Sequence, residues 1–220
     1  MPSETIIPLF PLGLVLLPQM PLPLHIFEER YKLMVDECLQ KNKGFGIVLL
    51  DGSDIQSIGC SARILKVLKR YDDGRLDIQT QGQERFVVKD MYDRKPYLEG
   101  RVTYFDDESE ENPEACQKLA RSGMELLKQF TTFTEMQEAY GFTEKLDFKS
   151  ISFVIAGFEG FSNEEKQRFL EMSSSYDRLR KSVASLEKII ERTKITTEIR
   201  KIIGGNGDMA NFSSKSIKIH

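Results

Sequence analysis

Few residues of this 220-residue chain have the types and the spacing that catalysis needs. Histidine occurs only at His25 and His220, and the chain contains neither G-x-S-x-G nor H-E-x-x-H. General acid–base chemistry would therefore have to use His25. This residue lies beside a proline-rich stretch and just before an expected helix, so we expect it to be buried or half-buried and bonded to backbone. The sequence predicts no catalytic residue and a protein that is not an enzyme.

Neither the cysteines nor the glycines form a recognisable cofactor site. Cys38, Cys60 and Cys116 are widely spaced and include no C-x-x-C pair, which indicates unpaired thiols in the core rather than a zinc or redox centre. No G-x-x-x-x-G-K-[ST] or G-x-G-x-x-G motif is present. The glycines of 204–207 follow a helix instead of opening one, which is the wrong end for a phosphate. We expect no metal and no cofactor.

A cluster of carboxylates separates the chain into two parts. Six acids fall within nine residues: Asp106, Asp107, Glu108, Glu110, Glu111 and Glu114. Adjacent carboxylates without a glycine turn make a poor calcium site, so we expect a solvated linker. The predicted domains are a β-rich subdomain over 1–107, a helical bundle over 112–203 and a flexible tail over 204–220.

Composition and charge indicate a soluble globular protein. Hydrophobic residues make up 40% of the chain and charged residues 30%, and the formal net charge is -3. No global field therefore recruits nucleic acid or an anionic membrane. The apolar stretch from Ile6 to Phe27 is long enough for a bilayer, but its five prolines would leave backbone groups unpaired in lipid. We expect a cytoplasmic protein without a membrane segment.

The first hundred residues predict short strands and one helix. The expected strands are 5–10, 13–17, 45–50, 58–70, 75–81, 86–89 and 97–105. Asp72-Asp73-Gly74 predicts a hairpin turn, because glycine tolerates the positive φ of tight turns. The helix is expected over Glu28–Lys41, where a stripe of apolar residues recurs at helical spacing.

After residue 112 the apolar period becomes helical. Asn112-Pro113 predicts the start of a first helix, and Ser162 with Glu165 predicts a capping box that opens a later one. The last helix is expected to begin near Tyr176, with a heptad-like seam that breaks at Thr193. We therefore expect a bundle that ends in a long helix rather than a continuous coiled coil.

Several blocks of sequence carry a more specific signal. They are Ile7-Pro8-Leu9-Phe10-Pro11-Leu12, Pro23-Leu24-His25-Ile26-Phe27-Glu28-Glu29-Arg30-Tyr31, Gly82-Gln83-Glu84-Arg85-Phe86 and Lys166-Gln167-Arg168-Phe169-Leu170-Glu171. In this order they resemble the N-terminal, substrate-binding domain of Lon proteases, over about residues 5–190. The resemblance implies an α+β fold: an N-terminal PUA-like β pseudo-barrel with one helix, followed by an α-helical bundle that ends in a long helix.

The resemblance also implies a function. Lon proteases continue into an ATPase module and a Ser-Lys peptidase domain, neither of which we expect here, so no catalytic residue carries over. The implied role is a stand-alone polypeptide-recognition module whose partners are unfolded or degron-bearing polypeptides and a protease or chaperone. The alternative is an RNA-binding module on a PUA-like barrel, because residues 176–203 carry eight Lys/Arg against four Asp/Glu.

The expected contact site is an apolar loop. Residues 17–23 combine large apolar side chains with prolines that hinder regular strand pairing, and loops run over surfaces. The predicted exposed patch consists of Leu17, Met20 and Leu22, with Phe133 and Met136 from the loop after the first bundle helix. Methionine suits such an adaptable surface. The alternative is that Met20 and Leu22 fold back under the barrel, since burying such a side chain gains roughly 1.5–3 kcal/mol.

Overall fold

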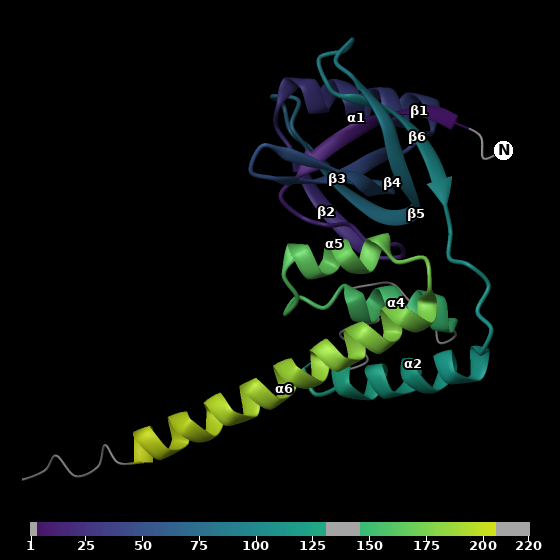
Figure 1. Ribbon diagram of the computed structural model, residues 1–220. Helices are drawn as coiled ribbons and strands as arrows, with labels where there is room; N and C mark the ends of the chain where they lie inside the picture. Colours follow the sequence, from purple (N-terminus) through teal and green to yellow (C-terminus); the bar gives the residue numbers. More distant parts are fainter. Residues whose placement is uncertain (1–3, 131–145, 206–220) are drawn as a thin grey trace, which may run out of the picture.

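The computed structural model describes residues 4–130 and 146–205, with side chains described up to residue 196. The strands are β1 (Glu4–Leu12), β2 (Pro21–Ile26), β3 (Phe45–Asp51), β4 (Asp54–Arg70), β5 (Leu76–Tyr92) and β6 (Glu99–Phe105). The helices are α1 (Glu29–Lys41), α2 (Pro113–Leu127), α4 (Phe148–Ala156), α5 (Asn163–Glu171) and α6 (Ser175–Gly205). The predicted α+β order, with strands first and a long helix last, is confirmed (Figure 1).

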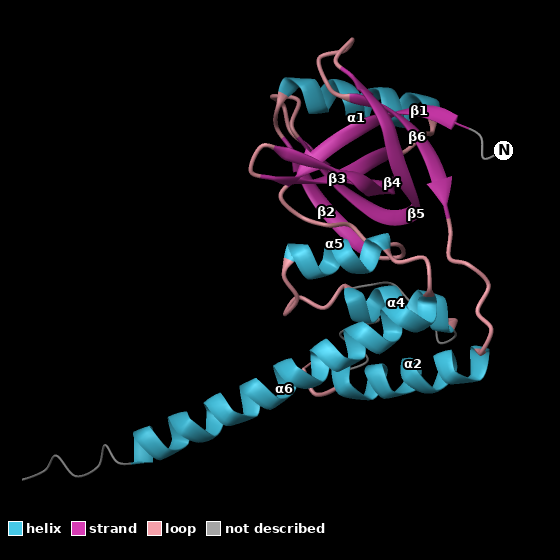
Figure 2. Cartoon of the chain, viewed as in Figure 1, coloured by secondary structure: helices cyan, strands magenta, loops and turns pink. Residues whose placement is uncertain are grey.

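The six strands form one sheet that closes on itself. The strand order is β2-β5-β4-β3-β1-β6, and β5 also pairs with β6. Closure depends on the length of β5, because its first half pairs with β2 and its second half pairs with β6. Figure 2 shows the strands wrapped around one another between α1 on one side and α2, α4, α5 and α6 on the other. Within 4–130 and 146–205, every helix is too short or too polar to cross a bilayer.

Glycines let the barrel interior close around one aromatic ring. The buried residues of this interior are Leu9, Val48, Phe86, Val88 and Val102. A Cβ added to Gly46 would lie 2.6 Å from Phe86 Cζ, and a Cβ added to Gly59 would lie at the same distance. Both distances are far inside van der Waals contact, so the strands can approach this ring only because these positions have no side chain.

The segment after β1 differs from the sequence prediction. The strand expected over 13–17 is an irregular loop, because β1 continues to Leu12 and the chain then bends away. The loop expected over 17–23 ends early, because β2 already begins at Pro21. Proline is tolerated there because β2 is the terminal strand in the sheet order, and a residue without an N–H can face its open edge.

The capping predictions for the helical part are confirmed. The Asn112 side chain accepts a hydrogen bond from the Ala115 N–H at 3.0 Å, and Ser162 forms a capping box with Glu165. The helix α6 buries the predicted seam of Leu179, Val183, Leu186 and Ile190. Residues 191–196 are all exposed, so α6 continues past the other helices into solvent (Figure 1).

The barrel and the helices share one hydrophobic core. Phe10 of β1 belongs to the same cluster of buried residues as Phe153 of α4 and Leu186 of α6. A hydrogen bond from Asn163 Nδ2 to Gly13 O, 2.7 Å long, also ties α5 to the loop after β1. The domain boundaries at 107 and 112 stay predictions, and most of the tail predicted over 204–220 lies outside the described residues.

Candidate functional site

One rim of the barrel opens into a cavity of about 730 Å³. β1 and β3 begin at this rim and β6 ends there, because β3 is parallel to β1 whereas β6 is antiparallel to it. The strand β4 reaches the cavity at Ser61–Ile64, and β5 reaches it at Gln83. The residues that follow α1 complete the lining, so that Ile6, Gly44 and Tyr104 come from three different segments around one opening.

A second cavity continues the first toward the helices. It measures about 460 Å³ and reaches Lys149 and Phe153 of α4. The residues that line both cavities are Gln19, Gln83, Glu84 and Tyr104. The two cavities therefore adjoin, and together we call them the rim groove, which extends from the end of α1 across the barrel mouth to the start of α4.

A strained residue lies where the two cavities meet. Gln19 has a φ of 67°, a left-handed conformation that few residues other than glycine adopt. Its N–H donates to Gly82 O at 2.9 Å, and the Gly82 N–H donates to Met20 O at 2.9 Å. A Cβ on Gly82 would lie 2.2 Å from Leu17 O, so glycine lets this segment cross β5 in close contact. Strained backbone of this kind clusters at ligand sites.

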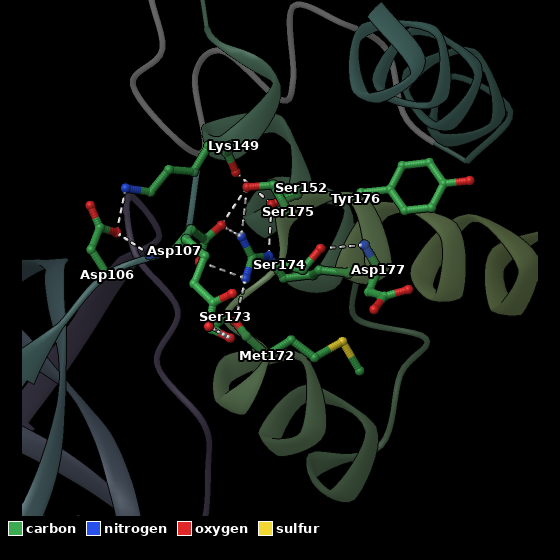
Figure 3. Close-up of polar contacts among 12 residues, drawn as sticks. Asp106, Asp107, Lys149, Ser152, Met172, Ser173, Ser174, Ser175, Tyr176 and Asp177 are labelled. Atoms are coloured by element: carbon green, nitrogen blue, oxygen red, sulfur yellow. Dashed lines mark hydrogen bonds and ion pairs between the residues drawn. The ribbon is translucent and has the colours of Figure 1, made fainter. Parts of the chain in front are cut away.

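Beside the groove, one carboxylate is buried between two arginines. Arg85 of β5 and Arg178 of α6 both form ion pairs with Asp107, and the three side chains are 2%, 0% and 5% exposed. Arg178 also donates to Ser152 Oγ at 2.7 Å and to Met172 O at 2.8 Å. Figure 3 shows Asp107, Ser152 and Met172 converging from separate segments of the chain. This network, the buried arginine pair, joins a strand, the linker and the helices.

The buried arginine pair corrects the expectation of a wholly solvated acidic linker. The Asp107 side chain is buried, whereas that of its neighbour Asp106 is 71% exposed. Burial lowers the pKa of both arginines, and the Asp107 carboxylate opposes that change. The excess positive charge lies against an aromatic ring, since Arg178 Cζ is 3.7 Å from the ring centroid of Phe153. Every group here has an internal partner, so the network holds the fold together.

His25 lies on the surface of the sheet. β2 places it opposite Asp77 of β5, and His25 Nδ1 is 2.6 Å from Asp77 Oδ1. Tyr71 Oη donates to the other carboxylate oxygen at 2.8 Å, and the hydrogen bonds from His25 and Tyr71 lower the pKa of Asp77. The His25 side chain is 44% exposed. The expectation of a buried or half-buried histidine bonded to backbone is therefore wrong, because pairing of β2 with β5 supplies a carboxylate.

The thiols are placed as the sequence predicts. Cys38, Cys60 and Cys116 are free and buried. Burial raises the pKa of Cys38 to about 11 and that of Cys60 to about 12, so both are neutral thiols near pH 7 and poor nucleophiles. In the part of the chain that the structure describes, no group of three or more His, Cys, Asp or Glu side chains is arranged to hold a metal ion.

The structure describes three of the five predicted contact residues, and these three do not form an exposed patch. Leu17 is 1% exposed and belongs to the core. Met20 and Leu22 are half-buried and pack against that core, and the Met20 side chain lies against Gly157 at the end of α4. Phe133 and Met136 lie outside the described residues. Neither Met20 nor Leu22 lines the rim groove, although Gln19 beside them does, and their role in binding stays a prediction.

Comparison with known families identifies the fold. The family model for the ATP-dependent protease La (LON) substrate-binding domain matches residues 6–188. The chain belongs to the Lon substrate-binding domain family. Two solved structures are similar to it: the Lon N-terminal domain protein from Xanthomonas campestris, with 25% identity and a TM-score of 0.61, and the N-terminal domain of the Mycobacterium avium complex Lon protease, with 19% identity and a TM-score of 0.65. These matches cover 82% and 83% of this chain and 98% of each of those chains.

Curated relatives of the Lon domain are much longer than this chain. Lon protease 2 of Myxococcus xanthus is 27% identical over 217 residues, and the Lon protease of Desulfosudis oleivorans is 26% identical over 210 residues. The matches cover 91% and 90% of this chain but 26% of each relative. The chain therefore spans about a quarter of the length of these relatives.

Sequence reasoning missed both the rim groove and the buried arginine pair. The block Gly82-Gln83-Glu84-Arg85-Phe86 supports the resemblance, but its residue types give no sign that Arg85 is buried. The alternation of buried residues along β5 from Leu76 to Gly82 predicts that Arg85 lies on the outer face of the barrel. In the structure the helices cover that face, so Arg85 is buried. The residue pattern within one strand cannot predict that a helix nearly ninety residues later in the chain packs against it.

Proposed function

We propose that this Lon domain is a polypeptide-recognition module, which binds unfolded or degron-bearing segments and performs no catalysis of its own. The observation that supports the proposal is the rim groove on a chain of this family. Two open cavities in series suit an extended chain segment better than a compact small molecule, which prefers a single enclosed pocket.

The lining of the groove also suits an extended segment. Ile6 is 50% exposed and offers an apolar contact at the barrel mouth. Gln19 offers an amide donor and acceptor, and Gln83, whose Nε2 already donates to Gln81 O and Gly82 O, offers its amide oxygen. An extended peptide presents backbone amides and alternating side chains, so it needs both kinds of contact. Met20 and Leu22 would extend the apolar contact beyond Gln19 once the segment reaches the end of α4.

The proposal includes a cellular setting. The module would act in the cytoplasm with a protease or a chaperone that processes the captured polypeptide, and no membrane or nucleic acid is needed for the interaction. High pKa values of Cys38 and Cys60 leave these thiols unsuited to covalent catalysis.

The test is binding of a fluorescent, reduced and alkylated model protein that stays unfolded, measured by anisotropy against the native form of the same protein. The wild-type chain should bind only the unfolded form, and Ile6→Ser should weaken binding severalfold. Leu50→Ser is the matched control, because Leu50 is 36% exposed at the opposite end of β3. Equal binding of native and unfolded protein, or tighter binding of single-stranded RNA, would reject the proposal.

The double variant Met20→Ser, Leu22→Ser tests the predicted contact residues. Normal thermal stability with weaker binding would assign these side chains to the site. A lower melting temperature with normal binding per folded molecule would assign them to the core.

A further inference from the structure

The strand β4 changes its side-chain pattern where it leaves the barrel. In the ladder between β4 and β5, the register shifts pass over Leu65 and over Leu68, so that neither residue has a paired residue on β5. A β-bulge of this kind turns one side chain out of the strict alternation of a strand. Leu65 is 51% exposed and Leu68 is 50% exposed. Two bulges, three residues apart, thus hold two leucines in solvent.

A row of cations accompanies the two leucines. Arg63, Lys66 and Lys69 pair with Gln81, Gln79 and Asp77 of β5. The intervening Ile64 and Val67 pair with the buried Thr80 and Ile78, so the three cations lie on the face away from the core. Residues 63–70 contain four Lys/Arg and no Asp/Glu. We call Arg63, Leu65, Lys66, Leu68 and Lys69 the basic strip.

The basic strip lies on an edge of the sheet. Pairing between β3 and β4 ends at Phe45 and Ala62, so beyond Ala62 the described residues of β4 pair with β5 alone. Lysines and bulges are common devices that keep such edges from pairing with another sheet. Those devices explain the cations and the broken ladder, but protection against aggregation would not place two large apolar side chains beside them in solvent.

We infer that the basic strip binds an acidic polypeptide segment that carries apolar anchor residues. Charge complementarity selects the acidic partner, and Leu65 and Leu68 supply contacts for its apolar side chains. The bulges disfavour addition of a regular strand, so the contact is made by side chains. The inference rests on the proposed function and narrows the class of polypeptide that the module binds. Arg63 and Ile64 also line the rim groove, so a segment bound on the strip continues into that groove.

The experiment uses two fluorescein-labelled peptides, one of leucine, glutamate and serine and one with lysine in place of every glutamate. The wild-type chain should bind the acidic peptide, with an affinity that falls as salt is raised. We expect the affinity for the acidic peptide to fall about tenfold in the triple variant Arg63→Gln, Lys66→Gln, Lys69→Gln. We expect a similar loss of affinity in the double variant Leu65→Ser, Leu68→Ser.

Matched controls carry the same changes elsewhere. The first control is a triple variant that changes three exposed cations of α2 and α6: Lys118→Gln, Lys181→Gln, Lys188→Gln. The second control is a double variant that changes two exposed apolar residues on other strands: Leu50→Ser, Met91→Ser. Both controls should bind the acidic peptide as the wild type does, and all variants should melt near the wild-type temperature because the changed side chains are exposed.

The possible failures separate the inference from the proposed function. Three results would overturn the inference: equal binding of the lysine peptide, normal binding of the acidic peptide by the strip variants, or binding of anionic vesicles in place of the peptide. The proposed function would still stand if the unfolded model protein binds. Failure of the wild type to bind both the acidic peptide and the unfolded model protein would overturn both.

Discussion

Arginine lies in opposite environments in two regions of this Lon domain. In the buried arginine pair, Arg85 and Arg178 are 2% and 0% exposed and share the carboxylate of Asp107. In the basic strip, Arg63 and its lysine neighbours are exposed on a sheet edge beside two exposed leucines. A cation with buried internal partners stabilises the fold. The cations of the strip are exposed, including Lys69, which lies over the Tyr71 ring, so a partner outside the fold can reach them.

The comparison assigns different consequences to changes in the two regions. A change in the buried arginine pair should lower the free energy of unfolding, because it leaves a buried charge without a counter-charge. A change in the basic strip should leave stability unchanged and affect binding alone.

The variant Asp107→Asn should be destabilised by about 3–5 kcal/mol, because it leaves two buried guanidiniums without their carboxylate. Urea denaturation followed by circular dichroism measures the change. Asp106→Asn is the control, since that carboxylate is 71% exposed in its ion pair with Lys149, and such exposed pairs contribute at most about 1 kcal/mol. Similar losses for the two variants would contradict the structural role of the buried pair.

The variant Gly82→Ala should lose about 1–3 kcal/mol of stability, because its Cβ would meet the carbonyl oxygen of Leu17 at 2.2 Å. It should also weaken binding of the unfolded model protein, because the displaced segment includes Gln19 of the rim groove. Gly13→Ala, where a Cβ would have open space, should change neither quantity. Weaker binding by Gly13→Ala alone would place the binding surface elsewhere.

The buried cysteines should be unreactive in the folded chain. Cys38 and Cys60, with pKa values raised to about 11 and about 12 by burial, should react with a disulfide reagent at about pH 8 only after unfolding. All three thiols of the chain should then react. Because none is in a disulfide, reducing agent should leave the melting temperature unchanged. Rapid reaction of a thiol in the folded chain would show that the core opens locally.

The smallest expected effect concerns Glu37 and acid stability. Hydrogen bonds from Lys95 and Lys41 lower the pKa of Glu37 from 4.5 to about 2. The carboxylate therefore contributes stability that is fully present above pH 4.5 and is lost as the pH falls from about 4.5 toward 2. Glu37→Gln should flatten the pH dependence of stability in that window, whereas Glu111→Gln, at an exposed position of the linker, should not. An unchanged slope in Glu37→Gln would show that these hydrogen bonds have no net effect.

The elements that depend on local chemistry are those that the sequence predicts well. The α1 helix, the capping box at Ser162 and the buried seam of α6 follow from spacing and from side chains that bond to nearby backbone. The Asp73-Gly74 turn lies where it was expected, between β4 and β5. The resemblance supplies the order of strands and helices, which the structure confirms.

The features that sequence reasoning missed depend on contacts between distant segments. Pairing of β2 with β5 places Asp77 beside His25 and makes a strand of residues expected to be a loop. The bulges at Leu65 and Leu68 are also invisible in the sequence, where the apolar residues at 64, 65, 67 and 68 predict one uninterrupted strand over 58–70. The rim groove forms only when five strands and two helices meet, so no single segment contains a signal for it.

The most direct test of polypeptide recognition is amide hydrogen exchange, measured by mass spectrometry with and without a saturating amount of the unfolded model protein. We expect slower exchange in residues 42–45, 61–70 and 83–84, which border the rim groove and form the basic strip, and no change in α2. Slower exchange confined to the helices, or no change anywhere at saturation, would contradict it.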